Sequence, residues 1–155
     1  MNFERSALAI QRMEATDVDE IVTLEVTCSS DPWSRNMFLG EMSNLLSHCF
    51  VARGMDSPRV LGFICFRNVG EESDLLNICI HPQHRQRGIG KRLMEFYIDF
   101  CRRRDVKRYY LEVNSLNQPA IRLYRSLSYQ STGVRAKFYA RTFDALLMMK
   151  EEQDG

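Results

Sequence analysis

The sequence predicts an α/β (α+β) protein in which helices pack against a mixed β-sheet. Short apolar runs with strand-like composition alternate with segments whose apolar residues recur at helical spacing. The chain has 155 residues, of which 45% are hydrophobic and 26% charged, so it is long and apolar enough to form a core without metal or disulfide support. We therefore expect residues 1–155 to form a single domain, with a frayed tail at 151–155.

Two helices are expected in the first third of the chain. Thr16 is expected to cap the first helix, and Asp17 and Asp19 suit the positive end of its dipole. Ser34, just after the chain break at Pro32, is expected to cap the second helix. The apolar face of the first helix is expected to consist of Ile21, Leu24, Val26 and Cys28.

Strands and helices alternate through the rest of the chain. A helix beginning near Ile89 has apolar side chains at i, i+3, i+4, i+7 and i+8 counted from Leu93, which is a continuous stripe. Asn117 is expected to cap a short helix that has Pro119 at its start. The expected order is β-α-α-β-β-β-α-β-α-β-β, with strands at 7–13, 49–53, 60–67, 74–80, 109–113, 129–140 and 143–150.

The composition argues against several classes of protein. The net charge is +1, so the chain lacks the overall basic field of a nucleic-acid-binding protein. No apolar run approaches the roughly 20 residues of a membrane helix, so no membrane partner is expected. No signal-peptide pattern begins the chain, and we therefore expect a cytoplasmic location.

The five cysteines suggest neither a disulfide framework nor a zinc site. They are odd in number, scattered, and without a C-x-x-C pair. Cys65 and Cys79 lie in apolar runs and are expected to be small buried thiols. His81 and His84 have a metal-like spacing, but Pro82 places them in a loop without a further ligand, so no metal is expected.

A basic turn with two glycines follows the strand at 74–80 and begins the next helix. Gly88 and Gly90 allow a ligand to approach the unpaired N–H groups of the first helical turn, where the helix dipole is positive. Residues 85–90, called the basic turn below, therefore predict a phosphate-binding site. Positive charge beside these amides comes from Arg85, Arg87 and Lys91.

The spacing of the basic turn leaves the identity of the phosphate ligand open. The Walker A pattern is absent, which excludes a P-loop nucleotide site. The dinucleotide fingerprint lacks its third glycine, since Leu93 occupies that position. Glu112, however, follows at about the distance of a ribose-binding acid, so a nicotinamide-dependent oxidoreductase stays an alternative.

Five segments together resemble the GNAT family of N-acetyltransferases, over nearly the whole chain and most closely in its bacterial ribosomal-protein-alanine branch. The R-x-x-G-x-G pattern of the basic turn resembles the family's acetyl-CoA-binding motif. The resemblance implies a mostly antiparallel central sheet flanked by helices, with acetyl-CoA as cosubstrate and no metal. The segments are Asp31-Pro32-Trp33-Ser34, Leu76 to Pro82, Gln86 to Gly90, Leu111-Glu112-Val113, and Asn117 with Ala120 to Tyr124.

The resemblance also implies roles for individual residues. Glu112 matches the proposed general base of the branch, and Tyr124 its general acid. Tyr139 lies where related enzymes place tyrosines that contact the acceptor, and Trp33, an aromatic residue after a proline, is a second weak candidate for lining that groove. The implied cofactor-binding residues are Ile78, Cys79 and Ile80 for the pantetheine arm, Gln86, Arg87, Gly88, Ile89, Gly90 and Lys91 for the pyrophosphate, and Asn117.

These two catalytic roles suit the chemistry of acetyl transfer to an amine. An α-amine has a pKa of about 8 and must lose a proton before it attacks a thioester. A carboxylate such as Glu112 can accept that proton, and a phenol such as Tyr124 can protonate the departing thiolate. Each residue also has a purely structural interpretation: Glu112 paired with Arg108 or Arg122, and Tyr124 as a core aromatic.

Three departures from the branch leave the acceptor open. Ser128 replaces a usual glycine, so a strained turn is expected there, while Phe138 and Asn114 replace a common tyrosine and a common arginine. The leading hypothesis is acetylation of a protein N-terminal α-amine, most specifically the N-terminal alanine of a ribosomal protein. The alternatives are a small amine or antibiotic, which an acidic groove would favour, the oxidoreductase named above, and a non-catalytic sensor that binds coenzyme A.

Overall fold

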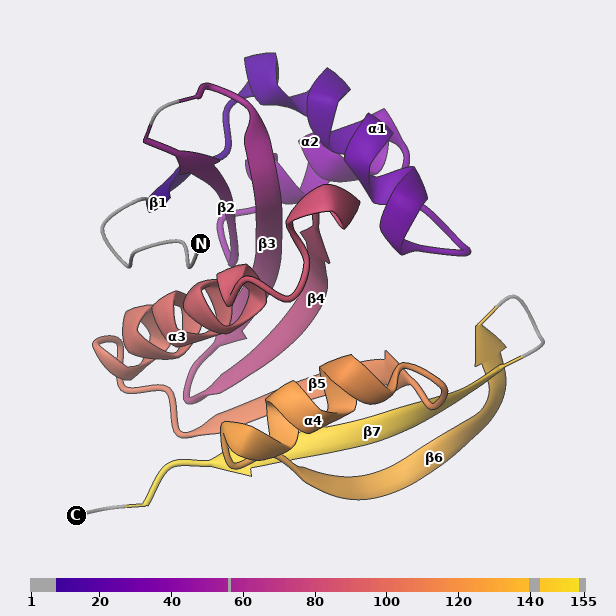
Figure 1. The fold of residues 1–155 in the computed structure, drawn as a ribbon. Helices are drawn as coiled ribbons and strands as arrows, with labels where there is room; N and C mark the ends of the chain where they lie inside the picture. The colour runs from indigo at the N-terminus through magenta and orange to yellow at the C-terminus, as the bar shows by residue number, and fades with distance from the viewer. Residues whose placement is uncertain (1–7, 56, 140–142, 154–155) are drawn as a thin grey trace.

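The computed structural model describes residues 8–55, 57–139 and 143–153, which form one seven-stranded sheet with helices on both faces (Figure 1). The strand order is β1-β2-β3-β4-β5-β7-β6. The predicted fold class and element order are confirmed. The elements are β1 (Leu8–Arg12), α1 (Val18–Cys28), α2 (Arg35–Ser43), β2 (Ser47–Gly54), β3 (Val60–Val69), β4 (Glu72–Ile80), α3 (Ile89–Arg102), β5 (Arg108–Asn114), α4 (Gln118–Ser126), β6 (Gln130–Tyr139) and β7 (Phe143–Glu151), with 3-10 turns η2 (Ala15–Asp17) and η3 (Pro82–His84).

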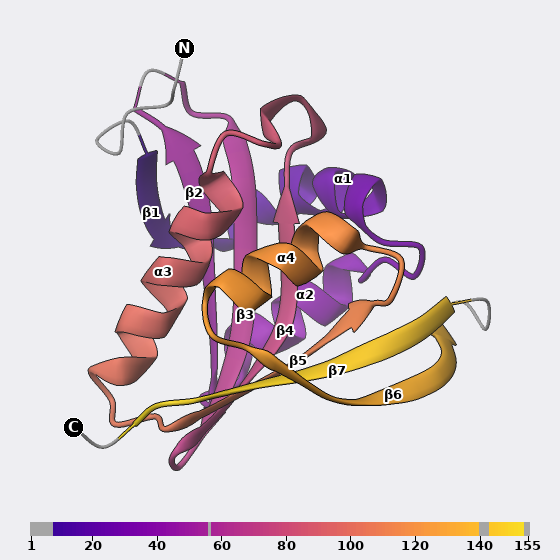
Figure 2. The same cartoon turned by 60° about the horizontal axis from the view of Figure 1, so that its bottom comes forward.

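The helices divide between the two faces of the sheet, α1 and α2 on one and α3 and α4 on the other (Figure 2). Side chains of a strand alternate between faces, so β3 contributes to both layers: Phe63 packs with α1 and α2, and Ile64 packs with α3. The predicted apolar stripe of α3 is confirmed, since Leu93, Tyr97 and Cys101 are fully buried. Among the helices described, none is both long and apolar enough to cross a membrane.

The centre of the sheet opens where β4 and β5 separate. These strands form the sheet's parallel pair, but their pairing runs only from Glu72 with Arg108 to Asp74 with Tyr110. Past Asp74 the two strands diverge, as Figure 1 shows. A β-bulge places Leu76 as an extra residue in β4 opposite β3, and bulges bend strands and increase their twist. The divergence leaves one edge of β4 facing a gap in the sheet.

Local capping explains where α1, α2 and α4 begin. Ser34 caps α2 by accepting a hydrogen bond from the Met37 N–H at 3.2 Å, as predicted. Asn117 caps α4 by accepting one from the Ala120 N–H at 3.3 Å, also as predicted. The prediction for Thr16 is wrong, because a capping box between Glu14 and Asp17 starts the η2 turn that leads into α1.

The predicted apolar face of α1 is partly wrong. Val26 is 63% exposed and Cys28 is also exposed, whereas Ile21 and Leu24 are buried as predicted. The fourth buried position of the helix, counted from Val18, is occupied by Glu25, a carboxylate. Counting from the buried Val18, helical periodicity places residues 21 and 25 on the inner face and residue 26 on the outer one.

The cysteine prediction also needs correction. Cys65 is a buried free thiol, as expected, but Cys79 forms a disulfide with Cys28. The two residues lie 51 positions apart in sequence, and their Cα atoms are 5.8 Å apart because the end of α1 packs on β4. That distance suits a disulfide, and the tertiary packing that creates it is invisible in cysteine spacing.

Candidate active site

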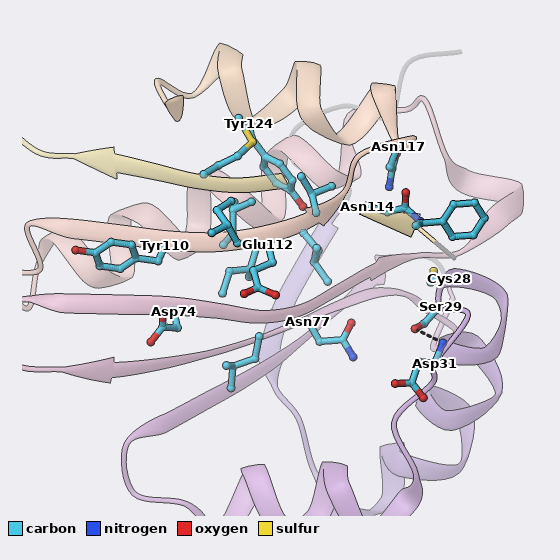
Figure 3. A pocket seen from close by; sticks show the side chains of 18 of the residues that line it. Cys28, Ser29, Asp31, Asp74, Asn77, Tyr110, Glu112, Asn114, Asn117 and Tyr124 are labelled. Atoms are coloured by element: carbon cyan, nitrogen blue, oxygen red, sulfur yellow. Dashed lines mark hydrogen bonds between the residues drawn. The ribbon is translucent and has the colours of Figure 1, made fainter. Parts of the chain in front are cut away.

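A cavity of about 1070 Å³ lies where β4 and β5 separate (Figure 3). Its walls come from the C-terminal end of α1, the segment 29–34 that joins α1 to α2, strands β4, β5, β6 and β7, and α4 with the residues just before it. The lining brings together five of the predicted site residues, Trp33, Ile78, Glu112, Asn117 and Tyr124, and it also contains Asn114, one of the three departures. The remaining predicted cofactor-binding residues, from Cys79 to Lys91, lie outside the lining.

Glu112 projects from β5 into this cavity, between Tyr110 and Asn77 in Figure 3. Its Oε1 lies 2.9 Å from a guanidinium nitrogen of Arg135 on β6, and its side chain is 31% exposed. The predicted partners are therefore wrong: Arg135, rather than Arg108 or Arg122, pairs with it. A partly exposed ion pair of this kind contributes at most about 1 kcal/mol to stability, so its main effect here is to orient the carboxylate.

Tyr124 belongs both to the core and to the cavity wall. Its side chain is 5% exposed, and its ring lies 5.8 Å from that of Tyr129. The end of α4 fixes this arrangement, because the Tyr129 N–H donates to the Tyr124 carbonyl and the Ser128 N–H donates to the Arg125 carbonyl, both at 3.0 Å. Ser128 has a φ of 74°, so the predicted strained turn is confirmed.

The edge of β4 that faces the gap carries the residues predicted to meet the pantetheine arm. Ile78, Cys79 and Ile80 pair with Ile64, Phe63 and Gly62 of β3 on one side only. In the described part of the chain, no strand pairs with their other edge. An unpaired strand edge offers N–H and C=O groups to an extended amide chain, which is the kind of group that pantetheine contains.

The basic turn has the backbone geometry of an anion site. Gln86 and Gly88 adopt left-handed conformations, with φ of 63° and 80°. Left-handed residues in a turn that leads into a helix can direct N–H groups to a common point, where an anion binds. A Cβ at Gly88 would meet nothing within 4 Å, so the backbone conformation, and not crowding, favours glycine there.

The other residues of the turn have different surroundings. A Cβ at Gly90 would make ordinary contacts with Leu123 and Ile80, at 3.6 and 3.7 Å. Arg87 and Lys91 are exposed beside the turn. Arg85 is turned away from these amides, since its guanidinium donates hydrogen bonds to the carbonyls of Ile80 at 3.2 Å and Thr27 at 3.3 Å, and it therefore joins β4 to α1.

Glu25 is a residue of the cavity that the sequence analysis missed. It is 1% exposed, and its Oε2 accepts hydrogen bonds from the Trp33 N–H at 3.0 Å and from the Asn77 side-chain amide at 2.7 Å. Burial raises the pKa of this carboxyl, and the two hydrogen bonds act in the opposite direction. The spacing of Val18, Ile21 and Glu25 could have identified it, because i, i+3 and i+7 lie on one face of a helix.

Trp33 lies between the core and the cavity. Its ring packs on Phe38 with 5.2 Å between ring centroids, and it also lines the cavity. Because Glu25 binds the Trp33 backbone, α1 determines the course of the loop. Tyr139, the other weak candidate, ends β6, but its side chain lies outside the described residues, as does that of Phe138.

The electrostatic character of the cavity is acidic. Four carboxylates belong to its lining, and no lysine or arginine does in the part of the chain that is described. Burial, aided by the nearby Glu72, raises the pKa of Asp74. Within the same residues, no group of three or more His, Cys, Asp or Glu side chains is arranged to hold a metal ion. The four carboxylates are Glu25, Asp31, Asp74 and Glu112.

These features together are those of an acyltransferase that binds a coenzyme thioester at an open strand edge and a phosphate-binding turn. The model of the Acetyltransferase (GNAT) family matches residues 18–129, and the chain belongs to this family. It is an N-acetyltransferase that uses acetyl-CoA, as predicted, and the family match rejects the nicotinamide alternative. The residues present fit this cosubstrate, since the unpaired edge of β4 borders the cavity at Ile78 and the same strand leads, through η3, into the basic turn.

Relatives of known name extend over almost the whole chain. The ribosomal protein bS18-alanine N-acetyltransferase of Escherichia coli K12 is 29% identical over 142 residues, covering 90% of this chain and 94% of that protein. The N-alpha-acetyltransferase RimI of Mycobacterium tuberculosis is 29% identical over 161 residues, covering 99% of each chain. The crystal structure of the E. coli ribosomal-protein-S18-alanine N-acetyltransferase matches with a TM-score of 0.86, 28% identity and 96% coverage of both chains.

Proposed function

We propose that this enzyme acetylates the α-amine at the N-terminus of a protein, and specifically the N-terminal alanine of a ribosomal protein. The observation that carries the proposal is the position of Glu112, which projects into the cavity beside the unpaired edge of β4. The names of relatives that are 29% identical over 90% or more of the chain support this choice of acceptor.

The proposed cosubstrate contacts follow the geometry of β4 and α3. Backbone groups of Ile78, Cys79 and Ile80 bind the pantetheine amides, because that strand edge has hydrogen-bonding groups directed into the gap. The amides of the basic turn, from Gln86 to Lys91, bind the pyrophosphate. Asn117, at the start of α4, contacts the cosubstrate from the opposite wall.

The proposed reaction is direct attack of the acceptor amine on the thioester. Glu112, directly or through a water molecule, accepts a proton from the α-ammonium group, whose pKa of about 8 leaves much of it protonated at neutral pH. A backbone N–H of β4 stabilises the oxyanion of the tetrahedral intermediate. Tyr124 donates a proton to the thiolate that leaves, so no covalent enzyme intermediate is needed.

The acidic lining supports a positively charged acceptor. The carboxylates of Asp31, Asp74 and Glu112 attract an ammonium group into the cavity, since like charges on the wall add their fields. The same lining favours a second candidate acceptor, a small polyamine or an aminoglycoside antibiotic. Trp33, with its ring on the wall at the loop, is the proposed contact for the first acceptor residue.

The test measures acetyl transfer to a panel of acceptors by detecting the free thiol of the coenzyme A that is released. The panel contains a peptide that begins with alanine, the same peptide with a blocked N-terminus, spermidine and an aminoglycoside. Turnover with the free peptide and none with the blocked one supports the proposal. Turnover with the small amines alone supports the second candidate, and tight acetyl-CoA binding without turnover on any acceptor supports a non-catalytic sensor.

Two further proposals concern the domain organisation of the protein and its location in the cell. We propose that residues 1–155 form one N-acetyltransferase domain, because strands from β1 to β7 join a single sheet. A cytoplasmic location is proposed because the Escherichia coli relative above is named for a ribosomal protein as acceptor.

A further inference from the structure

The disulfide between Cys28 and Cys79 lies at the wall of the proposed acceptor site. Cys28 is the last residue of α1, lines the cavity and is exposed to solvent. Cys79 is 2% exposed and lies in β4. The bond therefore joins the start of the loop 29–34 to the strand that borders the cavity.

We propose that Cys28 and Cys79 are a redox-modification site, a reversible disulfide that fixes the loop 29–34 beside the acceptor cavity. The oxidant is a peroxide and the reductant a dithiol. The covalent chemistry is independent of the enzyme's acceptor, whereas the effect on acceptor binding rests on the function proposed above.

The surroundings of Cys28 make its sulfur the reactive one of the pair. A guanidinium nitrogen of Arg85 lies 3.3 Å from the Cys28 sulfur, and a neighbouring positive charge favours the thiolate once the bond is reduced. The three other cysteines are buried free thiols, and burial raises the pKa of Cys101 to about 11. Exposure and positive charge therefore coincide at Cys28 and at no other cysteine.

Oxidation proceeds in two balanced steps. The Cys28 thiolate attacks one oxygen of hydrogen peroxide, the O–O bond breaks, and the hydroxide that leaves takes up a proton to become water, so that Cys28 carries a sulfenic acid. The Cys79 sulfur then attacks the Cys28 sulfur, and the sulfenic hydroxyl leaves with the Cys79 proton as a second water. A dithiol reverses the change: one of its thiolates attacks the exposed Cys28 sulfur and releases Cys79, which takes up a proton. Its second thiol then attacks the mixed disulfide, so that Cys28 leaves as a thiol and the reductant becomes a cyclic disulfide.

The local backbone accommodates both states. The carbonyl oxygens of Ile80 and Leu24 lie 3.6 and 3.5 Å from the sulfurs of Cys28 and Cys79, so each thiol has an acceptor in reach when the bond is reduced. β4 keeps its place in either state because Cys79 pairs with Phe63 of β3. The loop, in contrast, loses the covalent link at its start and keeps the hydrogen bond from the Trp33 N–H to Glu25. Asn77 and Arg85 still join α1 to β4 through hydrogen bonds.

Reduction should therefore act on the acceptor more than on the cosubstrate. Ser29, Asp31 and Trp33 of the loop line the cavity, and a loop that is freer before binding loses more conformational entropy when the acceptor orders it. We expect the KM for the acceptor peptide to rise about 3- to 10-fold on reduction, with kcat and the Kd for acetyl-CoA unchanged within about twofold.

The covalent claim is tested on the full chain by mass spectrometry. Protein reduced with dithiothreitol and freed of it is treated with hydrogen peroxide, denatured and alkylated. Two of its five thiols should become unreactive, the peptides containing Cys28 and Cys79 should be joined, and dithiothreitol should restore both thiols. Cys79→Ser should accumulate a sulfenic acid at Cys28, and Cys49→Ser, the matched control, should still form the bond. Peroxide that leaves all five thiols free, or oxidises Cys28 without joining Cys79, overturns the proposal.

The structural effect is tested without an acceptor by hydrogen exchange. Backbone amides of residues 29–34 should exchange at least about threefold faster in reduced than in oxidised protein, while those of β3 exchange equally. A Cys28→Ser, Cys79→Ser double variant should behave as reduced protein under both conditions. Equal exchange in both states contradicts the role of the bond, and it does so even if the acceptor proposed above is wrong. With an active acceptor, a peptide KM that is the same in both states contradicts it as well.

Discussion

Replacement of Ser128 by glycine is expected to stabilise the protein. Ser128 follows the end of α4 and has a φ of 74°, in the left-handed region. A side chain costs about 1 to 2 kcal/mol in that conformation, and glycine gives back about 0.5 to 1 kcal/mol through the entropy of the unfolded chain. The net gain is therefore about 0.5 to 1 kcal/mol, which corresponds to a Tm higher by about 1 to 4 °C for a chain of this length.

The assay is thermal and urea unfolding of the parent and the Ser128→Gly variant, both with the Cys28–Cys79 disulfide formed, monitored by circular dichroism. Ser128→Ala is the matched control, because alanine keeps the Cβ that makes the conformation costly, and its stability should stay within about 0.5 kcal/mol of the parent. If the glycine variant is no more stable than the alanine variant, the account of this turn is wrong.

Four further changes test the site. Glu112→Gln should lower kcat for acetyl transfer by about 10²- to 10⁴-fold and leave the Kd for acetyl-CoA, measured by calorimetry, unchanged. Tyr124→Phe should lower kcat by about 10²-fold or more in the same assay, with the Tm nearly unchanged because the buried ring remains. Gly88→Ala should weaken acetyl-CoA binding in calorimetry and cost about 1 kcal/mol of stability, because it places a Cβ at a φ of 80°. Burial raises the pKa of Glu25 in the folded protein, so the parent should lose stability relative to Glu25→Gln as the pH rises. The loss should begin near the unfolded-state pKa of about 4.3 and be complete above the raised pKa of the folded state, as measured by urea unfolding at each pH.

Specific results would contradict these expectations. Full activity of Glu112→Gln at neutral pH removes this carboxylate as the base, and normal turnover by Tyr124→Phe removes the phenol as the acid. Unchanged acetyl-CoA affinity in Gly88→Ala argues against pyrophosphate binding at the basic turn. A stability difference between the parent and Glu25→Gln that does not vary with pH means that Glu25 ionises alike in the folded and unfolded chains.

The elements that depend on local interactions could be predicted from the sequence. Ser34 and Asn117 cap helices through hydrogen bonds that span three residues, and the stripe on α3 repeats every three or four residues. The inner face of α1 is harder to predict from the sequence, because a carboxylate occupies a buried position there. Glu25 is tolerated in the interior because Trp33 and Asn77, far apart in sequence, donate hydrogen bonds to it.

The chemistry of the site could be predicted only in part, for a similar reason. Glu112 and Tyr124 were identified through the family resemblance, and the cavity contains both. The partner of Glu112 is Arg135. The sequence does not reveal this pairing, because the two residues come together only when β7 lies between β5 and β6 in the sheet. The disulfide was missed because cysteine spacing carries no information about which strand a helix end meets.

The central claim is that the cavity between β4 and β5 delivers a protein α-amine to acetyl-CoA. It is tested most directly with a peptide that begins with alanine and contains one internal lysine, incubated with enzyme and acetyl-CoA and then sequenced by tandem mass spectrometry. We predict a single acetyl group on the α-amine of the alanine, formed at least about 100-fold more slowly when Glu112→Gln replaces the parent enzyme. An acetyl group on the lysine side chain, or an unmodified peptide when spermidine is acetylated under the same conditions, would contradict the claim.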